Sequence, residues 1–238
     1  MFPSSVREGK LSGSERVEAA LDPNFWIERW KNAEIGFHRE KVHDFLPRYW
    51  PSLGLAAGSA VFVPLCGKSY DMVWLAAQGH RVIGCELSPL AVDAFFREQD
   101  LVADVRPEGT LAVWSAGPFT IWCGDIFELP AEAVRDVAAV YDRAALVAFP
   151  PSLQIRYAET LLTLLPTKVP ILLVSLAYPD GQINGPPFST PREQVDALFV
   201  ETHEIAVAET RDGLDDSQNL KARGVTSLDE TAYLLTRR

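Results

Sequence analysis

Cysteine and long apolar runs are both scarce in this 238-residue sequence. The three cysteines are far apart and form no CxxC pair, which excludes a disulfide framework and predicts reduced, buried thiols. No run approaches the ~20 apolar residues of a membrane helix. The N-terminal residues also lack the apolar core of a secretory signal. These absences favour a cytoplasmic protein with no membrane partner.

A cluster of basic residues is also missing. The sequence has 32 acidic and 22 basic residues, for a formal net charge of −10. A phosphate backbone repels such a surface, so nucleic acid is disfavoured as a partner. Hydrophobic residues make up 47% of the chain, enough for a sizeable core, and we expect a monomer.

The front of the chain divides into two parts. Residues 1–22 are polar and charged, and we expect a mobile arm with a short helix near 14–21. Residues 23–238 are expected to form one domain, in which 23–57 make a helical lid.

Aromatic residues concentrate in this expected lid. Asn24 is a candidate cap for a helix that places Trp26 and Trp30 on one face, one turn apart. Gly36 would end that helix, and a second helix is expected from about 38 to 49. Periodicity alone favours a packing role for these aromatic side chains over a ligand-binding role.

Beyond Gly58, apolar strands alternate with amphipathic helices. This pattern predicts an α/β fold with a mostly parallel sheet covered by helices on both faces, and an antiparallel hairpin at one edge near the C-terminus. The predicted strands are 61–65, 81–87, 119–123, 137–141, 171–177, 203–209 and 232–236, with 111–114 beside 119–123, and the predicted helices are 70–78, 90–99, 152–165 and 191–199.

The stretch VFVPLCGKS, residues 61–69, contains the Gly-Lys-Ser of a phosphate-binding loop. A Walker loop also needs a glycine five residues before Gly67, and that position is Phe62. The GxGxxG fingerprint is absent as well. The sequence therefore excludes both common phosphate loops, while Gly67 still allows a ligand to approach the backbone closely.

A glycine or a polar residue lies at the end of four of the predicted strands. Ligands of open α/β sheets bind where the strands end, and an acid after the second strand commonly holds a ribose diol. Glu86 has that place, Asp125 and Ile126 follow the third strand, and Arg143 follows the fourth. Together with Gly67 these residues outline an adenosine-type site, although Glu86 alone could be a plain surface acid.

Four motifs resemble the thiopurine S-methyltransferase family: FWIERW…IGFH, VFVPLCGKSYDMVWLAAQGHRVIGCELS, CGDIF and YDRAALVA. The resemblance covers roughly residues 22–238. It implies the class I S-adenosylmethionine-dependent methyltransferase fold, which is Rossmann-like with a seven-stranded sheet, and transfer of a methyl group to the sulfur of a small aromatic or heteroaromatic thiol.

The resemblance also implies site residues. Trp30 would cover the cofactor, Leu65 and Gly67 would offer backbone to its methionine part, and Glu86 would hold the ribose. Asp125 and Ile126 would border the adenine, and Arg143 would face the cofactor carboxylate or the substrate. Lys221 or Arg223 could supply a further basic group.

The residues suggest how such a site would work. Trp26, Trp30 and Phe37 can exclude water and face a sulfonium cation. Arg143 can favour the thiolate form of the acceptor, because an opposite charge lowers the pKa of an acid. His38 either holds the lid or only packs there. The histidines show no metal-binding spacing, so no metal is expected.

Two alternative functions remain open. A methyltransferase of the same fold could act on halide, thiocyanate, or selenium or tellurium species, and a smaller acceptor cavity would favour it. A non-catalytic S-adenosylmethionine-binding protein would have a plugged acceptor cavity. The segment AFPPS, residues 148–152, lacks the Asn or Asp that base-amine methyltransferases place before Pro-Pro, which disfavours nucleic-acid amines as substrates.

Overall fold

The computed structural model describes residues 22–238. The predicted arm, with its short helix near 14–21, lies outside these residues except for Asp22. None of the described helices is long and apolar enough to cross a membrane.

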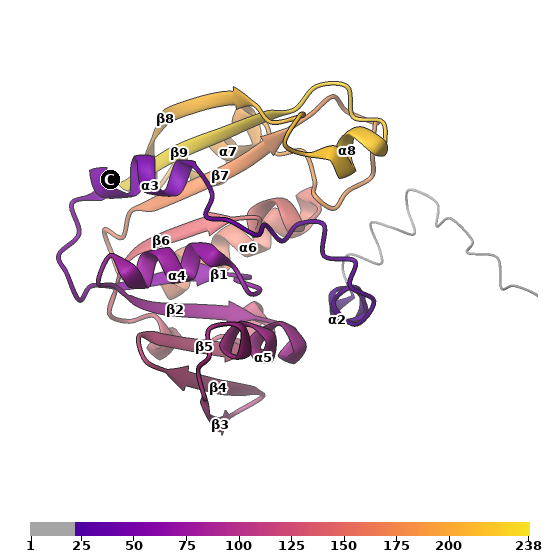
Figure 1. The fold of residues 1–238 in the computed structure, drawn as a ribbon. Helices are drawn as coiled ribbons and strands as arrows, with labels where there is room; N and C mark the ends of the chain where they lie inside the picture. Colours follow the sequence, from indigo (N-terminus) through magenta and orange to yellow (C-terminus); the bar gives the residue numbers. More distant parts are fainter. Residues whose placement is uncertain (1–21) are drawn as a thin grey trace, which may run out of the picture.

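A single mixed sheet forms the centre of the described chain (Figure 1). Its order is β3-β4-β5-β2-β1-β6-β7-β9-β8, and the five strands from β5 to β7 run parallel. The strands are β1 (Ala60–Pro64), β2 (Arg81–Glu86), β3 (Asp104–Glu108), β4 (Leu111–Ala116), β5 (Phe119–Cys123), β6 (Val137–Arg143), β7 (Ile171–Ala177), β8 (His203–Asp212) and β9 (Asp229–Arg237).

Helices cover both faces of the sheet (Figure 1). The α-helices are α2 (Pro23–Lys31), α3 (Phe45–Tyr49), α4 (Tyr70–Ala77), α5 (Pro89–Glu98), α6 (Pro151–Leu164), α7 (Arg192–Phe199) and α8 (Gln218–Ala222), and the 3-10 helices are η1 (Trp50–Leu53), η2 (Ile126–Glu128), η3 (Ala131–Ala133) and η4 (Leu146–Ala148). One apolar layer joins α3, α4 and α5 to the sheet, and a second layer joins α6 and α7 to the other face. The predicted α/β architecture is therefore confirmed.

The sheet has nine strands among the described residues, not the predicted seven. The hairpin of β3 and β4 lies beside β5; β4 confirms the strand predicted at 111–114 beside 119–123, whereas β3 was not predicted. All five residues of β3 are exposed and it contains Pro107, so it carries no apolar alternation that could have predicted it. The predicted C-terminal hairpin is present, and β9 lies between β7 and β8.

Two predictions in the expected lid are wrong in detail. Asp22, not Asn24, caps α2, because its side chain accepts from the backbone N–H of Asn24. The second helix covers only Phe45–Tyr49, since the preceding residues run as an irregular segment over α4. Phe45, Leu46 and Trp50 are buried in the core, so this part of 23–57 packs on the sheet and does not cover a site.

The carboxyl ends of the parallel strands meet at one edge of the sheet. Figure 1 shows α2 and α8 beyond this edge, at opposite sides of it. The last strand residues and the loops that follow them are therefore enclosed by segments from both ends of the chain.

Candidate functional site

A cavity of about 550 Å³ lies at this edge of the sheet. The loops after β1, β2, β5 and β6 line it, together with α2, the segment after α2, and the region around α8. Its size is typical of small-molecule sites in enzymes. All the predicted site residues line it: Trp26, Trp30, Phe37, His38, Leu65, Gly67, Glu86, Asp125, Ile126 and Arg143.

The turn after β1 has a left-handed backbone at two residues, with φ of 46° at Leu65 and 51° at Gly67. A side chain at Gly67 would place its Cβ 3.2 Å from Cζ2 of Trp30, so the indole ring packs directly on this turn. Gly84 in β2 makes room for the same turn, because a Cβ there would lie 2.7 Å from Sγ of Cys66. Gly84 therefore makes room for the turn after β1, and Gly67 allows the indole ring of Trp30 to pack on that turn.

Glu86 holds a buried carboxylate at the end of β2. The backbone N–H of Gly67 donates to Oε2 at 2.9 Å, and the N–H of Ser88 donates to Oε1 at 2.8 Å. Burial raises the pKa of Glu86, while these backbone donors lower it and limit the rise. This side chain is not a plain surface acid: it is 6% exposed and fixed in the cavity wall.

The turn after β5 places Asp125 and Ile126 beside Glu86. Gly124 approaches the strand end closely, and its N–H donates to the carbonyl of Glu86 at 2.9 Å. Asp125 caps η2 by accepting from the N–H of Phe127 at 3.0 Å. Ile126 is buried, so this part of the cavity offers an apolar surface next to a carboxylate.

Aromatic rings from α2 and the next loop form the cover. The ring of Phe37 lies edge-to-face against Trp26 and Trp30, with centroids 5.7 and 5.6 Å apart. His38 lies near the ring of Tyr70, and burial and the nearby Lys68 lower its pKa. A lowered pKa favours the neutral imidazole, so His38 adds little positive charge to the aromatic cover.

Arg143 ends β6 and is half-buried in the cavity wall. Its Nη2 lies 3.5 Å from the carbonyl oxygen of Phe37, which connects the strand end to the cover. The preceding Asp142 faces away and organises the turn, accepting from Tyr157 Oη at 2.7 Å and from the N–H of Leu146 at 3.1 Å. Burial raises the pKa of Asp142 to about 6.

The two candidate basic residues near α8 differ in position. Lys221 forms an exposed ion pair with Asp215, at 3.0 Å, and does not line the cavity. Arg223 lines the cavity and donates to the carbonyls of Pro186 and Gly185 at 2.7 and 3.1 Å. Of these two, Arg223 is the one that can face a ligand.

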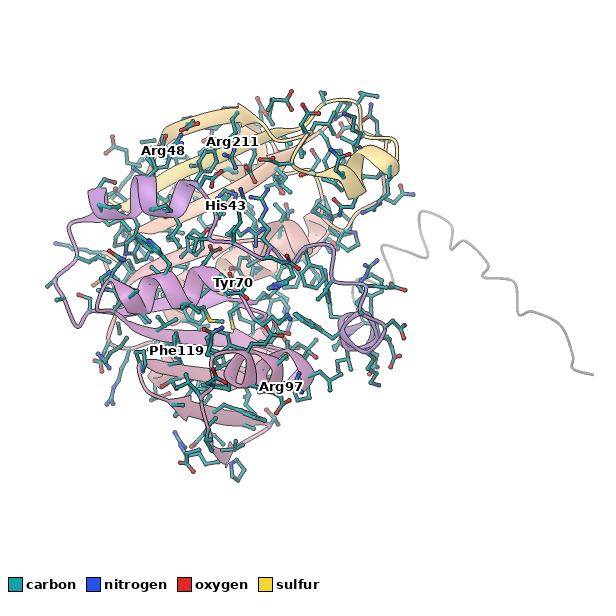
Figure 2. All side chains as sticks on the ribbon, in the orientation of Figure 1. His43, Arg48, Tyr70, Arg97, Phe119 and Arg211 are labelled. Atoms are coloured by element: carbon teal, nitrogen blue, oxygen red, sulfur yellow. The ribbon has the colours of Figure 1, made fainter. Side chains whose placement is uncertain are left out.

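The sequence did not indicate a buried polar cluster at the inner end of the cavity. Glu230 accepts from Arg211 at 2.6 Å and pairs with Nε2 of His43 at 2.9 Å. Figure 2 labels His43 and Arg211. Asp71 accepts from the backbone N–H of His43 and from the hydroxyl of Tyr141. The partners in this cluster are 19 to 187 residues apart, so they carry no local sequence signal.

The same cluster fixes the charge of Glu230. Burial raises the pKa of Glu230, but His43 and Arg211 outweigh it and lower the pKa to about 2. Glu230 and Asp71 line the cavity, and both are committed to protein partners.

The cysteines are free thiols, as predicted. Burial raises the pKa of Cys66 and Cys85 well above the ordinary value, and it raises that of Cys123 to about 11. Since the thiolate is the nucleophile, the raised pKa values disfavour a nucleophilic role for these cysteines.

Sequence comparison identifies relatives along nearly the whole described chain. The profile of the thiopurine S-methyltransferase family matches residues 21–238. The thiopurine S-methyltransferase of Pseudomonas entomophila is 48% identical over 217 residues, covering 91% of this chain and 100% of the relative. That of Methylococcus capsulatus is 46% identical over 216 residues, covering 90% and 97%.

Solved structures with low sequence identity have a similar fold. The 1,6-didemethyltoxoflavin-N1-methyltransferase of Burkholderia thailandensis, solved with S-adenosylhomocysteine, superposes with a TM-score of 0.58 at 15% identity and covers 98% of this chain and 92% of its own. A phosphoethanolamine-type N-methyltransferase of Haemonchus contortus superposes with a TM-score of 0.58 at 10% identity, over 81% of this chain and 52% of its own. These neighbours confirm the predicted class I methyltransferase fold, and the sequence matches show that the chain belongs to the thiopurine S-methyltransferase family of S-adenosylmethionine-dependent enzymes.

Proposed function

We propose that this protein transfers a methyl group from S-adenosylmethionine to the sulfur of a small aromatic or heteroaromatic thiol. The observation that carries the proposal is one cavity that combines the fixed carboxylate of Glu86 with a cover of Trp26, Trp30 and Phe37. The relatives named thiopurine S-methyltransferase, at 46% to 48% identity, support the same conclusion.

The residues of the cavity fit the methyl donor. The carboxylate of Glu86 can accept both hydroxyls of a ribose, because two backbone N–H groups already orient it. The backbone at Leu65 and Gly67 can approach the methionine part, and Asp125 with Ile126 can border the adenine. S-adenosylmethionine supplies an electrophilic methyl group on a sulfonium when it is bound.

The chain contributes alignment and a dry environment. Trp26, Trp30 and Phe37 exclude water and present aromatic faces, which attract a sulfonium-type cation. Arg143 stabilises the thiolate of the acceptor, because a cation within a few ångströms lowers the pKa of an acid. The thiol proton then passes to solvent, and no strong general base is needed.

The shape of the cavity favours an organic thiol over the two alternatives. Pro186, Pro187 and Phe149 line it in addition to the donor-binding residues, which gives an acceptor apolar walls. A halide needs no such volume. A binding protein without catalytic activity would have this space filled, whereas Pro186, Pro187 and Phe149 line an open cavity that is continuous with the donor-binding residues.

The test uses Arg143→Ala with labelled S-adenosylmethionine and thiophenol as acceptor. Loss of the cation should reduce kcat/KM by about tenfold or more below the pKa of the thiol, and the loss should shrink at higher pH, where the thiol ionises unaided. Arg97→Gln on α5 is the control, since Arg97 is exposed and outside the cavity (Figure 2). Full kcat/KM in Arg143→Ala at low pH would refute this role.

A screen of thiols, halides and selenium compounds with the same labelled donor distinguishes the proposed acceptor from the alternatives. Turnover confined to inorganic acceptors would overturn the proposal. We further propose that residues 23–238 act as one catalytic domain, as a cytoplasmic monomer, which size-exclusion chromatography with light scattering and cell fractionation would test.

A further inference from the structure

Arg39 is a charged residue of the cavity to which the proposed reaction gives no role. It belongs to the segment between α2 and α3, is half-buried, and lines the cavity two residues after Phe37. Its Nη1 is buried and has no hydrogen-bond partner, and Arg39 forms no ion pair with any residue in the described part of the chain. A buried guanidinium nitrogen without a partner is costly, so a ligand that satisfies it gains affinity.

The acids that line the cavity do not neutralise Arg39: neither Asp125 nor Asp216 forms an ion pair with it, and the three buried acids are committed to other partners. Asp71 accepts from His43 and Tyr141, Glu86 accepts from two backbone N–H groups, and Glu230 is paired with His43 and Arg211. These three buried carboxylates are therefore already satisfied within the protein.

A second guanidinium faces the same space. Arg143 comes from the end of β6, and its contact with the carbonyl of Phe37 ties it to the segment that carries Arg39. Lys68 also lines the cavity, but it pairs with Glu98 at 2.6 Å. Arg39 and Arg143, which form no ion pair with a described residue, thus line the same cavity, and its buried acids are all committed to protein partners.

We propose that Arg39, together with Arg143, binds a carboxylate of a ligand. Guanidinium groups bind carboxylates through two parallel hydrogen bonds, which would give the unpartnered Nη1 of Arg39 an acceptor and neutralise the local charge. The carboxylate has two possible sources, the amino-acid part of the methyl donor or an acceptor that carries a carboxylate besides its thiol. These two sources are taken from the proposed function, and the inference rests on it to that extent. The test measures ligand binding, so its outcome does not depend on turnover.

Calorimetry separates the two sources. The donor comparison measures S-adenosylhomocysteine against 5′-methylthioadenosine, which lacks the amino-acid carboxylate. The acceptor comparison measures benzoate against benzamide, both added to the complex with S-adenosylhomocysteine. Each is run on the natural protein, on Arg39→Gln, on Arg39→Lys, and on Arg97→Gln as the exposed control.

Loss of a charge-assisted hydrogen bond should reduce the preference for the carboxylate form by about tenfold or more in Arg39→Gln. Arg39→Lys should retain part of this preference, and Arg97→Gln should retain all of it. A change confined to the donor comparison assigns the site to the donor, and a change confined to the acceptor comparison assigns it to the acceptor. If Arg39→Gln alters neither preference by more than twofold while its melting temperature matches the natural protein, the inference is wrong.

Discussion

Replacing Glu230 with glutamine should destabilise the fold by about 3 kcal/mol at pH 7. The partners of Glu230 lower its pKa from 4.5 to about 2, and each pKa unit corresponds to about 1.4 kcal/mol of preference for the charged form. Glutamine keeps the size of the side chain and can still bond His43, but it removes the charge that Arg211 faces at 2.6 Å. The expected loss is a large part of the 5–15 kcal/mol that usually stabilises a folded protein.

The effect has a definite dependence on pH. Because the pKa of Glu230 is lower in the folded protein than in the unfolded chain, the stabilisation is complete above about pH 5 and is lost as the pH falls toward 2. The difference in the free energy of unfolding between the natural protein and Glu230→Gln should therefore become smaller at acidic pH.

Urea denaturation followed by tryptophan fluorescence measures both the loss of stability at pH 7 and its dependence on pH. Glu209→Gln is the matched control, since Glu209 pairs with Arg48 and Tyr49 near the surface, where ion pairs contribute little. A loss below about 1 kcal/mol at pH 7 in Glu230→Gln, or a loss that stays constant as the pH falls, would show that this network does not stabilise the fold as the structure indicates.

Three further predictions concern the ligand site. Glu86→Gln should weaken S-adenosylhomocysteine binding by about tenfold or more. In the natural protein, the affinity for S-adenosylhomocysteine should fall as the pH drops through the raised pKa of Glu86. Calorimetry of Glu86→Gln should show no such fall. Gly67→Ala should weaken the same binding, because its Cβ would meet Trp30 at 3.2 Å and the backbone is left-handed there; a larger affinity loss from Gly67→Ala than from Trp30→Ala would locate the cost in the backbone. Arg223→Gln should raise the KM for an aromatic thiol by several-fold while Lys221→Gln leaves it unchanged, and equal KM values for the two variants would remove Arg223 from the acceptor site.

The sequence predicted the elements whose own residues determine their structure. Strand β1 was evident because all five of its residues are buried, and β7 was predicted with its observed bounds. Glu86 and Arg143 were found because each is the last residue of a largely buried strand. In such cases burial and chain order contain the necessary information.

The elements that the sequence did not predict are held in place by contacts with other segments of the chain. Residues 38–44 were expected to be helical, yet distant partners hold them in an irregular path: Asp71 accepts from the N–H of His43, and Arg211 binds Asp44 at 3.1 Å. Strand β3 is held by backbone pairing with β4 and buries none of its residues. The position of Arg39 in the cavity wall likewise follows from the path of its segment and not from its own sequence.

The place of β9 in the sheet has a consequence for biosynthesis. Strand β8 leaves the ribosome before β9, but in the finished sheet it hydrogen-bonds only to β9, as does the outer edge of β7. A nascent chain therefore carries two unsatisfied strand edges, a hazard for aggregation, until residues 229–237 emerge. The same nine residues bring Glu230 to His43, so the inner end of the cavity is among the last parts of the molecule to assemble.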